Sequence, residues 1–129
     1  MNSEFSNEVE VNVKTQYQVV YSNPLKDIFI FSYNISITNH RSTTIQLLRR
    51  RWQIFDNEIF IQEVEGAGVI GLQPVLKPQT SHNYESGCQI ATPKGLMSGE
   101  YLFRDLEKNY NFHVKIPKFI LEVPKIFLN

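Results

Sequence analysis

Strict alternation of apolar and polar residues is the feature that most constrains how this chain can fold. From Val9 to Val19 the odd positions are apolar or β-branched, and the even positions between them are polar. A β-strand points successive side chains to opposite faces, so this pattern predicts a strand with one buried face. The same period returns from Ile28 to Thr38, and no segment carries a convincing helical stripe.

Turn signals divide the rest of the sequence into further strands. Seven or eight strands with turns every ~8–12 residues predict an all-β fold, an antiparallel sandwich of the immunoglobulin-like or fibronectin type III-like kind. The polar residues 1–7 are expected to be frayed. Residues 66–79 form the longest irregular stretch. The further strands are expected at 44–55, 59–65, 80–91, 99–105, 110–116 and 118–123.

Size and charge point to one ordinary soluble domain, residues 1–129. Thirteen basic residues balance thirteen acidic ones, so no overall field directs the chain to nucleic acid or to an anionic membrane. The lone Cys88 cannot form an internal disulfide, which indicates a reducing compartment. The first residues lack a signal-peptide pattern, and no apolar run approaches the ~20 residues that span a bilayer. We therefore expect a cytoplasmic protein.

The stretch EGAGVIG, residues 65–71, has the G-x-G-x-x-G spacing of a dinucleotide-binding fingerprint. In a Rossmann site such glycines follow a strand and open a helix whose N-terminus holds the pyrophosphate. A strand is expected before Gly66, but Pro74 and Pro78 stand where the helix would run. The Rossmann interpretation therefore fails.

Two interpretations of Gly66, Gly68 and Gly71 remain open. The first is a loop in which the glycines adopt positive φ or let the chain cross closely, and it is favoured because such loops are common. The second is an anion nest, in which successive backbone N–H groups converge on an oxyanion.

The run Arg49–Arg51 is the only basic cluster. On a strand Arg49 and Arg51 point one way, whereas Arg50 shares a face with Leu48 and Trp52. Arginine offers a bidentate fork, so the run could clamp an anion or a carboxylate. The commoner role is a solvated outer face, with Arg50 stacked on Trp52.

Four blocks of sequence resemble a known family, the bacterial ApaG family. They are similar to its Q-L-L-x-R-x-W, V-x-G-x-G-V-V-G-x-Q-P-x-L-x-P, Y-x-S-G-x-x-x-x-T-P-x-G-x-M-x-G-x-Y and I-P-x-F-x-L motifs. Together they cover nearly the whole chain in the same order. The blocks are QLLRRRW (46–52), EVEGAGVIGLQPVLKP (63–78), YESGCQIATPKGLMSGEYLF (84–103) and IPKFILEVP (116–124).

The resemblance implies a seven-stranded sandwich similar to fibronectin type III. The family name reflects a gene neighbourhood with a diadenosine-tetraphosphate hydrolase, and the family is associated with cobalt and magnesium efflux. Related domains in eukaryotic F-box proteins are expected to recruit substrates. The family supplies no catalytic residues to carry over. One departure concerns a turn: residues 56–58 read Asp-Asn-Glu where many members have Asn-Gly.

Metal binding has little support in the sequence. Glu63 and Glu65 share one face of a strand and could hold a hard cation such as Mg²⁺, but an exposed acidic edge that discourages strand pairing is the commoner role. His40, His82 and His113 lie far apart and show no metal-ligand spacing. We expect no metal site and no cofactor.

Catalysis has equally little support. Ser86 lacks a G-x-S-x-G elbow and Cys88 is expected to be a buried small hydrophobe, so no nucleophile, base and oxyanion donor are assembled. We therefore expect a non-catalytic binding module with a protein partner, and the apolar residues around Phe119 and Phe127 would suit a partner or a homodimer. The alternative is binding of a phosphorylated small molecule at Gly66–Gly71 with help from Arg49–Arg51.

Overall fold

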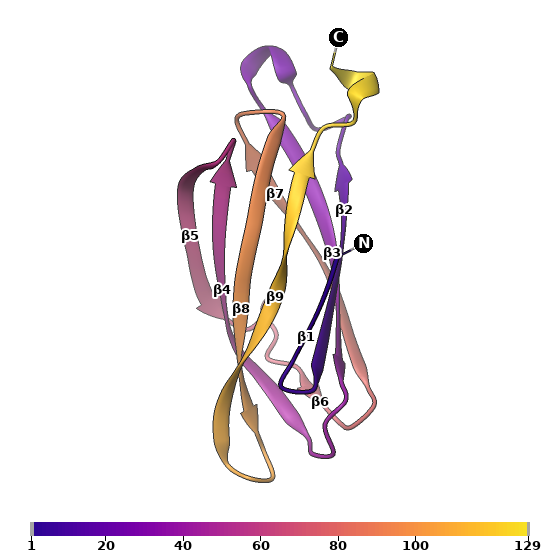
Figure 1. The fold of residues 1–129 in the computed structure, drawn as a ribbon, viewed down its shortest axis with the longest axis vertical. Helices are drawn as coiled ribbons and strands as arrows, with labels where there is room; N and C mark the ends of the chain where they lie inside the picture. The colour runs from indigo at the N-terminus through magenta and orange to yellow at the C-terminus, as the bar shows by residue number, and fades with distance from the viewer. Residues whose placement is uncertain (1, 129) are drawn as a thin grey trace.

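A computed structural model describes residues 2–128 as a sandwich of two antiparallel sheets (Figure 1). One sheet has the strand order β1-β2-β3-β7, and the other β5-β4-β8-β9 with the short β6 also paired to β4. This confirms the predicted all-β sandwich. No helix in residues 2–128 is long and apolar enough to cross a membrane. The strands are β1 Asn2–Ser6, β2 Val9–Tyr17, β3 Phe29–Asn39, β4 Ile45–Asp56, β5 Ile59–Ala67, β6 Val75–Leu76, β7 Ser81–Ile90, β8 Lys94–Asp105 and β9 Tyr110–Glu122, with 3-10 turns η1 Pro24–Lys26 and η2 Lys125–Phe127.

The core lies between the sheets and is built from the alternating positions of the strands. On β2 the odd residues Val9–Val13 are fully buried, as their period of two predicts. Across the core, the Trp52 ring lies 5.5 Å from the Tyr33 ring and meets Phe119 edge-on at 5.8 Å. Burying each such large side chain contributes roughly 1.5–3 kcal/mol, so these rings anchor one sheet on the other.

Residues 2–6 form a strand, so the expectation that residues 1–7 are frayed is wrong for them; Met1 lies outside the described residues. β1 pairs with β2 and also reaches β9 in the other sheet. The backbone N–H of Lys115 donates to Ser6 Oγ at 2.9 Å, and Asn7 Nδ2 donates to His113 O at 2.6 Å. Pairing with the neighbouring β2, together with side-chain hydrogen bonds to β9, thus orders a polar segment that has little apolar surface of its own.

β9 runs unbroken through Pro117, where the sequence predicted an interruption between two strands. The β8–β9 register shifts between Met97 and Gly99, opposite Pro117. At such a bulge a residue need not donate to the ladder, so proline is tolerated. β8 likewise begins at Lys94 rather than at Gly99, and β6 lies within the stretch expected to be irregular.

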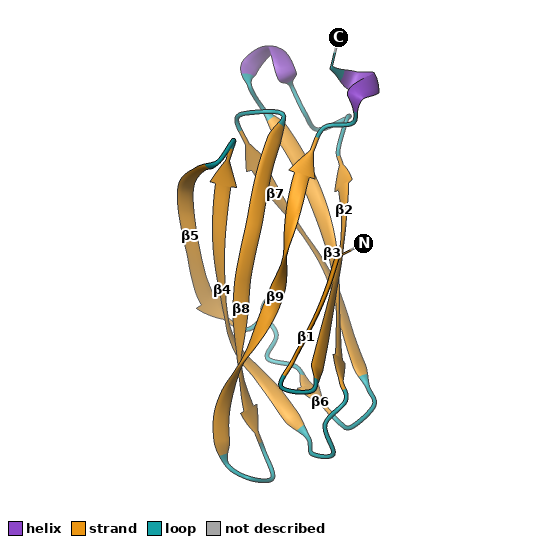
Figure 2. Ribbon diagram, viewed as in Figure 1, coloured by secondary structure: helices purple, strands orange, loops and turns teal. Residues whose placement is uncertain are grey.

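The two sides of the sandwich differ. β1 and β9 close one side, whereas β5 and β7 are the edge strands on the other side (Figures 1 and 2). The two 3-10 turns lie together at one end of the molecule (Figure 2). The sandwich therefore has one open side, between β5 and β7, and one end that carries both 3-10 turns (Figure 2).

Candidate functional site

Gly68 allows the glycine loop to lie tightly against β4. Its φ is +62°, its N–H donates to Leu48 O at 2.8 Å, and an added Cβ would lie 2.0 Å from Leu72 O. A side chain cannot fit there without moving backbone. This is the close crossing with positive φ that the first interpretation of the loop expects.

Gly71 belongs to a two-residue hairpin turn that follows. Val69 and Leu72 exchange two backbone hydrogen bonds, of 2.8 and 3.0 Å, around Ile70 and Gly71. Both central residues have positive φ, +47° and +73°, which makes this a type I′ turn. The N–H groups of residues 68, 69 and 72 all donate to protein carbonyls, so an anion nest would have to use other N–H groups of the loop.

Arg50 holds the loop from the side between the sheets. Its Nη1 donates to Ala67 O and to Gly68 O, both at 3.0 Å. A Cβ on Gly66 would lie 2.8 Å from Nη1, so the missing side chain leaves room for the guanidinium. The structure therefore brings Arg50 and the glycine loop together, as the sequence suggested, but through the carbonyl oxygens of the loop.

Arg49 and Arg51 lie on the outer face, because alternation divides the basic cluster between two faces. Arg51 forms an ion pair with Glu63 through a short contact, and its Nη1 lies 3.8 Å from Glu100 Oε1. Glu63 therefore has an arginine as its neighbour, and Glu65 lines a shallow hollow with all three arginines. Within residues 2–128 no group of three or more His, Cys, Asp or Glu could hold a metal ion.

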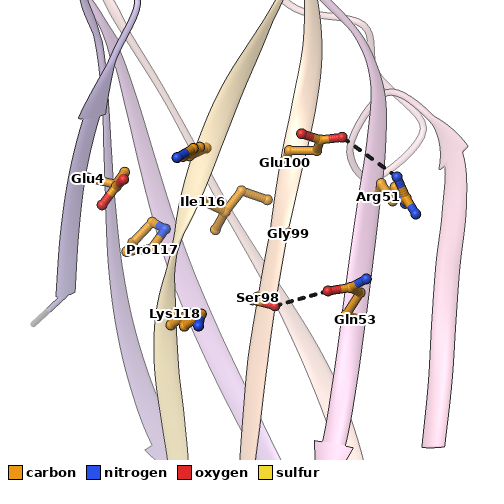
Figure 3. A pocket seen from close by; sticks show the side chains of 10 residues that line it. Glu4, Arg51, Gln53, Ser98, Gly99, Glu100, Ile116, Pro117 and Lys118 are labelled. Carbon is orange, nitrogen blue, oxygen red and sulfur yellow. Dashed lines mark hydrogen bonds and ion pairs between the residues drawn. The ribbon is translucent and has the colours of Figure 1, made fainter. Parts of the chain in front are cut away.

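One hollow, about 570 Å³, is a groove on the outer face across β1, β9, β8 and β4 (Figure 3). Gly99 and Pro117, at the β8–β9 bulge, lie on its floor. Part of its polar lining is engaged: Ser98 Oγ donates to Gln53 Oε1 at 3.5 Å, and Arg51 reaches Glu100. Glu4, Lys115 and Lys118 form no ion pair within residues 2–128. Because the groove is open, whereas ligand sites are concave and enclose their ligand, it is a weak candidate for a ligand site.

A second hollow, about 420 Å³, opens between the edge strands β5 and β7 and is called the inter-sheet cleft here. Its lining comes from both sheets and from the hairpin turn. It includes Arg50 and Trp52 on β4, Tyr84 and Ser86 on β7, and Ile70 in the turn. Ligand pockets in proteins measure roughly 300–1,000 Å³ and combine apolar walls with a few polar groups. The cleft therefore has the size and the composition of a small-molecule site.

Buried hydroxyl groups gather beside the cleft. Tyr84 Oη lies 2.5 Å from Tyr101 Oη, and Tyr33 pairs in register with Ser86. Burial raises the pKa of Tyr33, Tyr84 and Tyr101, so these phenols stay protonated and can donate. The sequence-based reasoning missed this cluster, although Tyr84, Ser86 and Cys88 share one face of an expected strand.

Burial also raises the pKa of the Cys88 thiol, to about 11. The thiol is therefore protonated at neutral pH, and the reactive thiolate is scarce. Cys88 packs against the core but is only half-buried, so the expectation of a buried small hydrophobe holds in part. Ser86 is a polar wall residue of the cleft.

The three histidines lie apart, as their sequence spacing predicted. His40 Nε2 lies 3.0 Å from Glu10 Oε1 on the first sheet. His113 Nδ1 lies 3.8 Å from Glu100 Oε1 on the outer face of the second. His82 stacks against the ring of Tyr84. Each histidine therefore has a neighbour of its own, and none shares a site with another.

Large apolar side chains are exposed at the end of the sandwich that carries η1 and η2. Leu25 is 100% exposed and Val20 88%, and Phe127 packs its ring 5.8 Å from Tyr17 while remaining 45% exposed. Phe119, in contrast, belongs to the core. The sequence-based reasoning pointed only to the C-terminal residues of this surface. The signal that it missed is the break in alternation at residues 19–21, where three apolar side chains follow one another. We call this surface the apolar end: Val19, Val20, Tyr21, Leu25, Ile126, Phe127 and Leu128.

Fold and site together define a two-sheet β-sandwich with an exposed apolar end and a polar cleft on its open side. The profile of the ApaG domain matches residues 19–105. The chain is 41% identical over 125 residues to Protein ApaG of Brucella abortus (strain S19), covering 97% of this chain and 95% of that protein. The chain therefore belongs to the ApaG domain family, as the sequence motifs indicated.

Other relatives agree. Protein ApaG of Paramagnetospirillum magneticum is 42% identical over 124 residues, covering 96% of this chain and 95% of that protein. A crystal structure from Bordetella pertussis, named as an ApaA protein, superposes with a TM-score of 0.87 at 38% identity, covering 91% of this chain and 94% of the other. The sandwich is thus shared with a solved relative.

Proposed function

We propose that this ApaG-domain protein is a non-catalytic binding module that recognises a protein partner through its apolar end. The observation that carries the proposal is the exposure of seven large apolar side chains at one end of the sandwich. Such side chains are normally buried, and an exposed cluster of them is typical of a protein interface. Covering them would remove apolar surface from water, which favours association.

The same surface supports two narrower expectations. It would equally suit a second copy of the chain, so a homodimer is the simplest form of the partner. On this proposal the module works in the cytoplasm, in keeping with its single Cys88, and the association with cobalt and magnesium efflux is made through the partner.

Site-specific photocrosslinking tests the proposal directly. A benzophenone amino acid replaces Leu25 in one variant and Val75, which is 53% exposed on β6, in a control variant. β6 lies towards the other end of the molecule (Figure 1). We expect irradiated cells to give a discrete adduct at position 25 and none at position 75. No adduct at position 25, or the same adducts at both positions, would contradict the proposal.

A second candidate function is binding of a phosphorylated small molecule near Gly66–Gly71 and Arg49–Arg51. It is supported by the contact of Arg50 with the loop and by the absence of an ion pair for Arg50 within residues 2–128. Calorimetry with diadenosine tetraphosphate and pyrophosphate tests it, and no heat from either ligand would exclude it.

A further inference from the structure

The inter-sheet cleft exists because the sandwich is closed on one side only. On the closed side, Ser6 and Asn7 bond across to β9. On the open side the edge strands β5 and β7 flank a space of about 420 Å³. Its lining residues include none of the seven that form the apolar end, so whatever binds there is independent of a partner at that end.

Among the described residues, Arg50 is the one cationic side chain that lines the cleft. A half-buried charge in a protein is usually paired with an opposite charge, because desolvation of an unpaired ion is costly. Arg50 has no carboxylate within ion-pair distance among residues 2–128. Its hydrogen-bond partners among the described residues are two carbonyl oxygens, those of Ala67 and Gly68, whose dipoles offset part of the charge.

The two carbonyls leave much of the guanidinium available. Both bonds come from Nη1, and neither Nε nor Nη2 forms a hydrogen bond within the described residues. Nε and Nη2 form one edge of the planar group, and that edge matches two oxygens of a carboxylate or a phosphate. The bonds to the loop hold the guanidinium in place, so little side-chain freedom is lost when an anion binds.

The walls of the cleft specify the rest of the ligand. The buried residues Trp52, Val69 and Met97 form its apolar base, and the half-buried Val64 and Tyr84 supply apolar surface from opposite sheets. Ser86 contributes a hydroxyl on the same side as Tyr84. An aromatic group between two such walls would bury apolar area and stack on flat side chains.

We propose that the inter-sheet cleft binds a small organic anion, with its carboxylate or phosphate on Arg50 and an aromatic body against Val64 and Tyr84, beside the buried Trp52. In this proposal the anion of the second candidate function binds in the inter-sheet cleft and not on the backbone N–H groups of the glycine loop. The proposal does not rest on the protein-binding function.

Trp52 provides a readout confined to the site, since it is the one tryptophan of the chain and lines the cleft. The probes are phenylacetate and phenyl phosphate, with uncharged phenylacetamide as the matched control. Fluorescence and calorimetry are recorded on the same samples. We expect a saturable Trp52 change with at least one anion and binding of phenylacetamide that is about tenfold weaker or more. Comparing the two anions identifies the headgroup.

Three variants test whether Arg50 binds the anion. Arg50→Gln should weaken anion binding about tenfold or more, whereas Arg49→Gln, on the outer face, should leave it unchanged. Ser86→Asp places a carboxylate in the cleft without touching the bonds of Arg50 to the loop. Ser86→Asp should weaken binding of the two anions but not binding of phenylacetamide. If Arg50→Gln does not fold, this variant alone tests whether the anion binds in the cleft.

Three results would overturn the proposal. The first is neither a saturable Trp52 response nor binding heat from either anion. The second is an equal loss of binding in Arg49→Gln and Arg50→Gln, which would place the anion on the outer face. The third is binding heat without a Trp52 response, which would place it away from the cleft and leave the loop backbone as the site.

Discussion

Asp105 shows how one buried residue at the end of β8 organises a neighbouring loop. Its carboxylate accepts hydrogen bonds from Thr43 Oγ1 at 2.6 Å and from the N–H groups of Glu107 and Lys108 at 3.0 and 2.8 Å. Arg41 Nη2 lies 3.3 Å away. Burial alone would raise the pKa of Asp105, but these donors outweigh it and lower the pKa to about 2.

A pH dependence of stability follows from Asp105. Its folded pKa lies below its ordinary value, so its contribution is complete above about pH 4 and is lost as the pH falls towards 2. Urea denaturation at a series of pH values should show stability falling across this window. In Asp105→Asn the acid-dependent loss should be smaller, and an unchanged pH slope in that variant would contradict the assignment.

Ile70 is a strained residue that is mostly exposed. A β-branched side chain at φ +47° is unfavourable, and Ile70 keeps 59% of its surface in water. Asparagine followed by glycine is the preferred pair for a type I′ turn. Ile70→Asn should therefore raise the free energy of unfolding by about 1 kcal/mol, measured by urea denaturation. A loss of stability would mean that contacts of Ile70 outweigh its backbone strain.

At the scale of elements, the glycine loop makes different demands on Gly68 and Gly71. Gly68→Ala would force a Cβ to 2.0 Å from Leu72 O and should cost about 3 kcal/mol of unfolding free energy. At Gly71 nothing lies within 4 Å of an added Cβ. Gly71→Ala should therefore lower the free energy of unfolding by only about 1 kcal/mol, because alanine is unfavourable at positive φ. Thermal unfolding of both variants checks this, and equal losses would contradict the geometry.

The same geometry bears on how ligand binding can be tested. A β-branched residue at position 68 would displace the loop whether or not it holds an anion. Loss of binding in such a variant would therefore not identify a nest. Arg50 and Ser86 are the informative positions, because each lines the cleft and can be changed with less disturbance to the backbone.

The strands that the sequence predicted best are those whose own alternation defines a buried face, such as β2 and β3. β1 was missed because partner strands order it. The break predicted at Pro117 was wrong because the bulge depends on the register of β8. Alternation also separated Arg50 from Arg49 and Arg51, so part of the site was predictable. The cleft was not predictable from the sequence, since its existence depends on which sheet edges remain uncovered.

At the scale of the whole molecule, the sandwich offers two independent surfaces. The apolar end is formed by the β2–β3 connection and residues 126–128, and the inter-sheet cleft by β4, β5, β7 and the hairpin turn. Because the two share no lining residue, a variant of one should leave binding at the other unchanged.

The most direct test of the central claim is the affinity of the partner captured at position 25. Its binding to the unaltered chain, to Leu25→Ser and to Val75→Ser would be compared by calorimetry with purified proteins. Leu25 is fully exposed, so the substitution should not unfold the chain. We predict that Leu25→Ser weakens binding about tenfold, the loss expected for one well-packed apolar contact, and that Val75→Ser does not. Equal affinity of all three proteins would contradict the account.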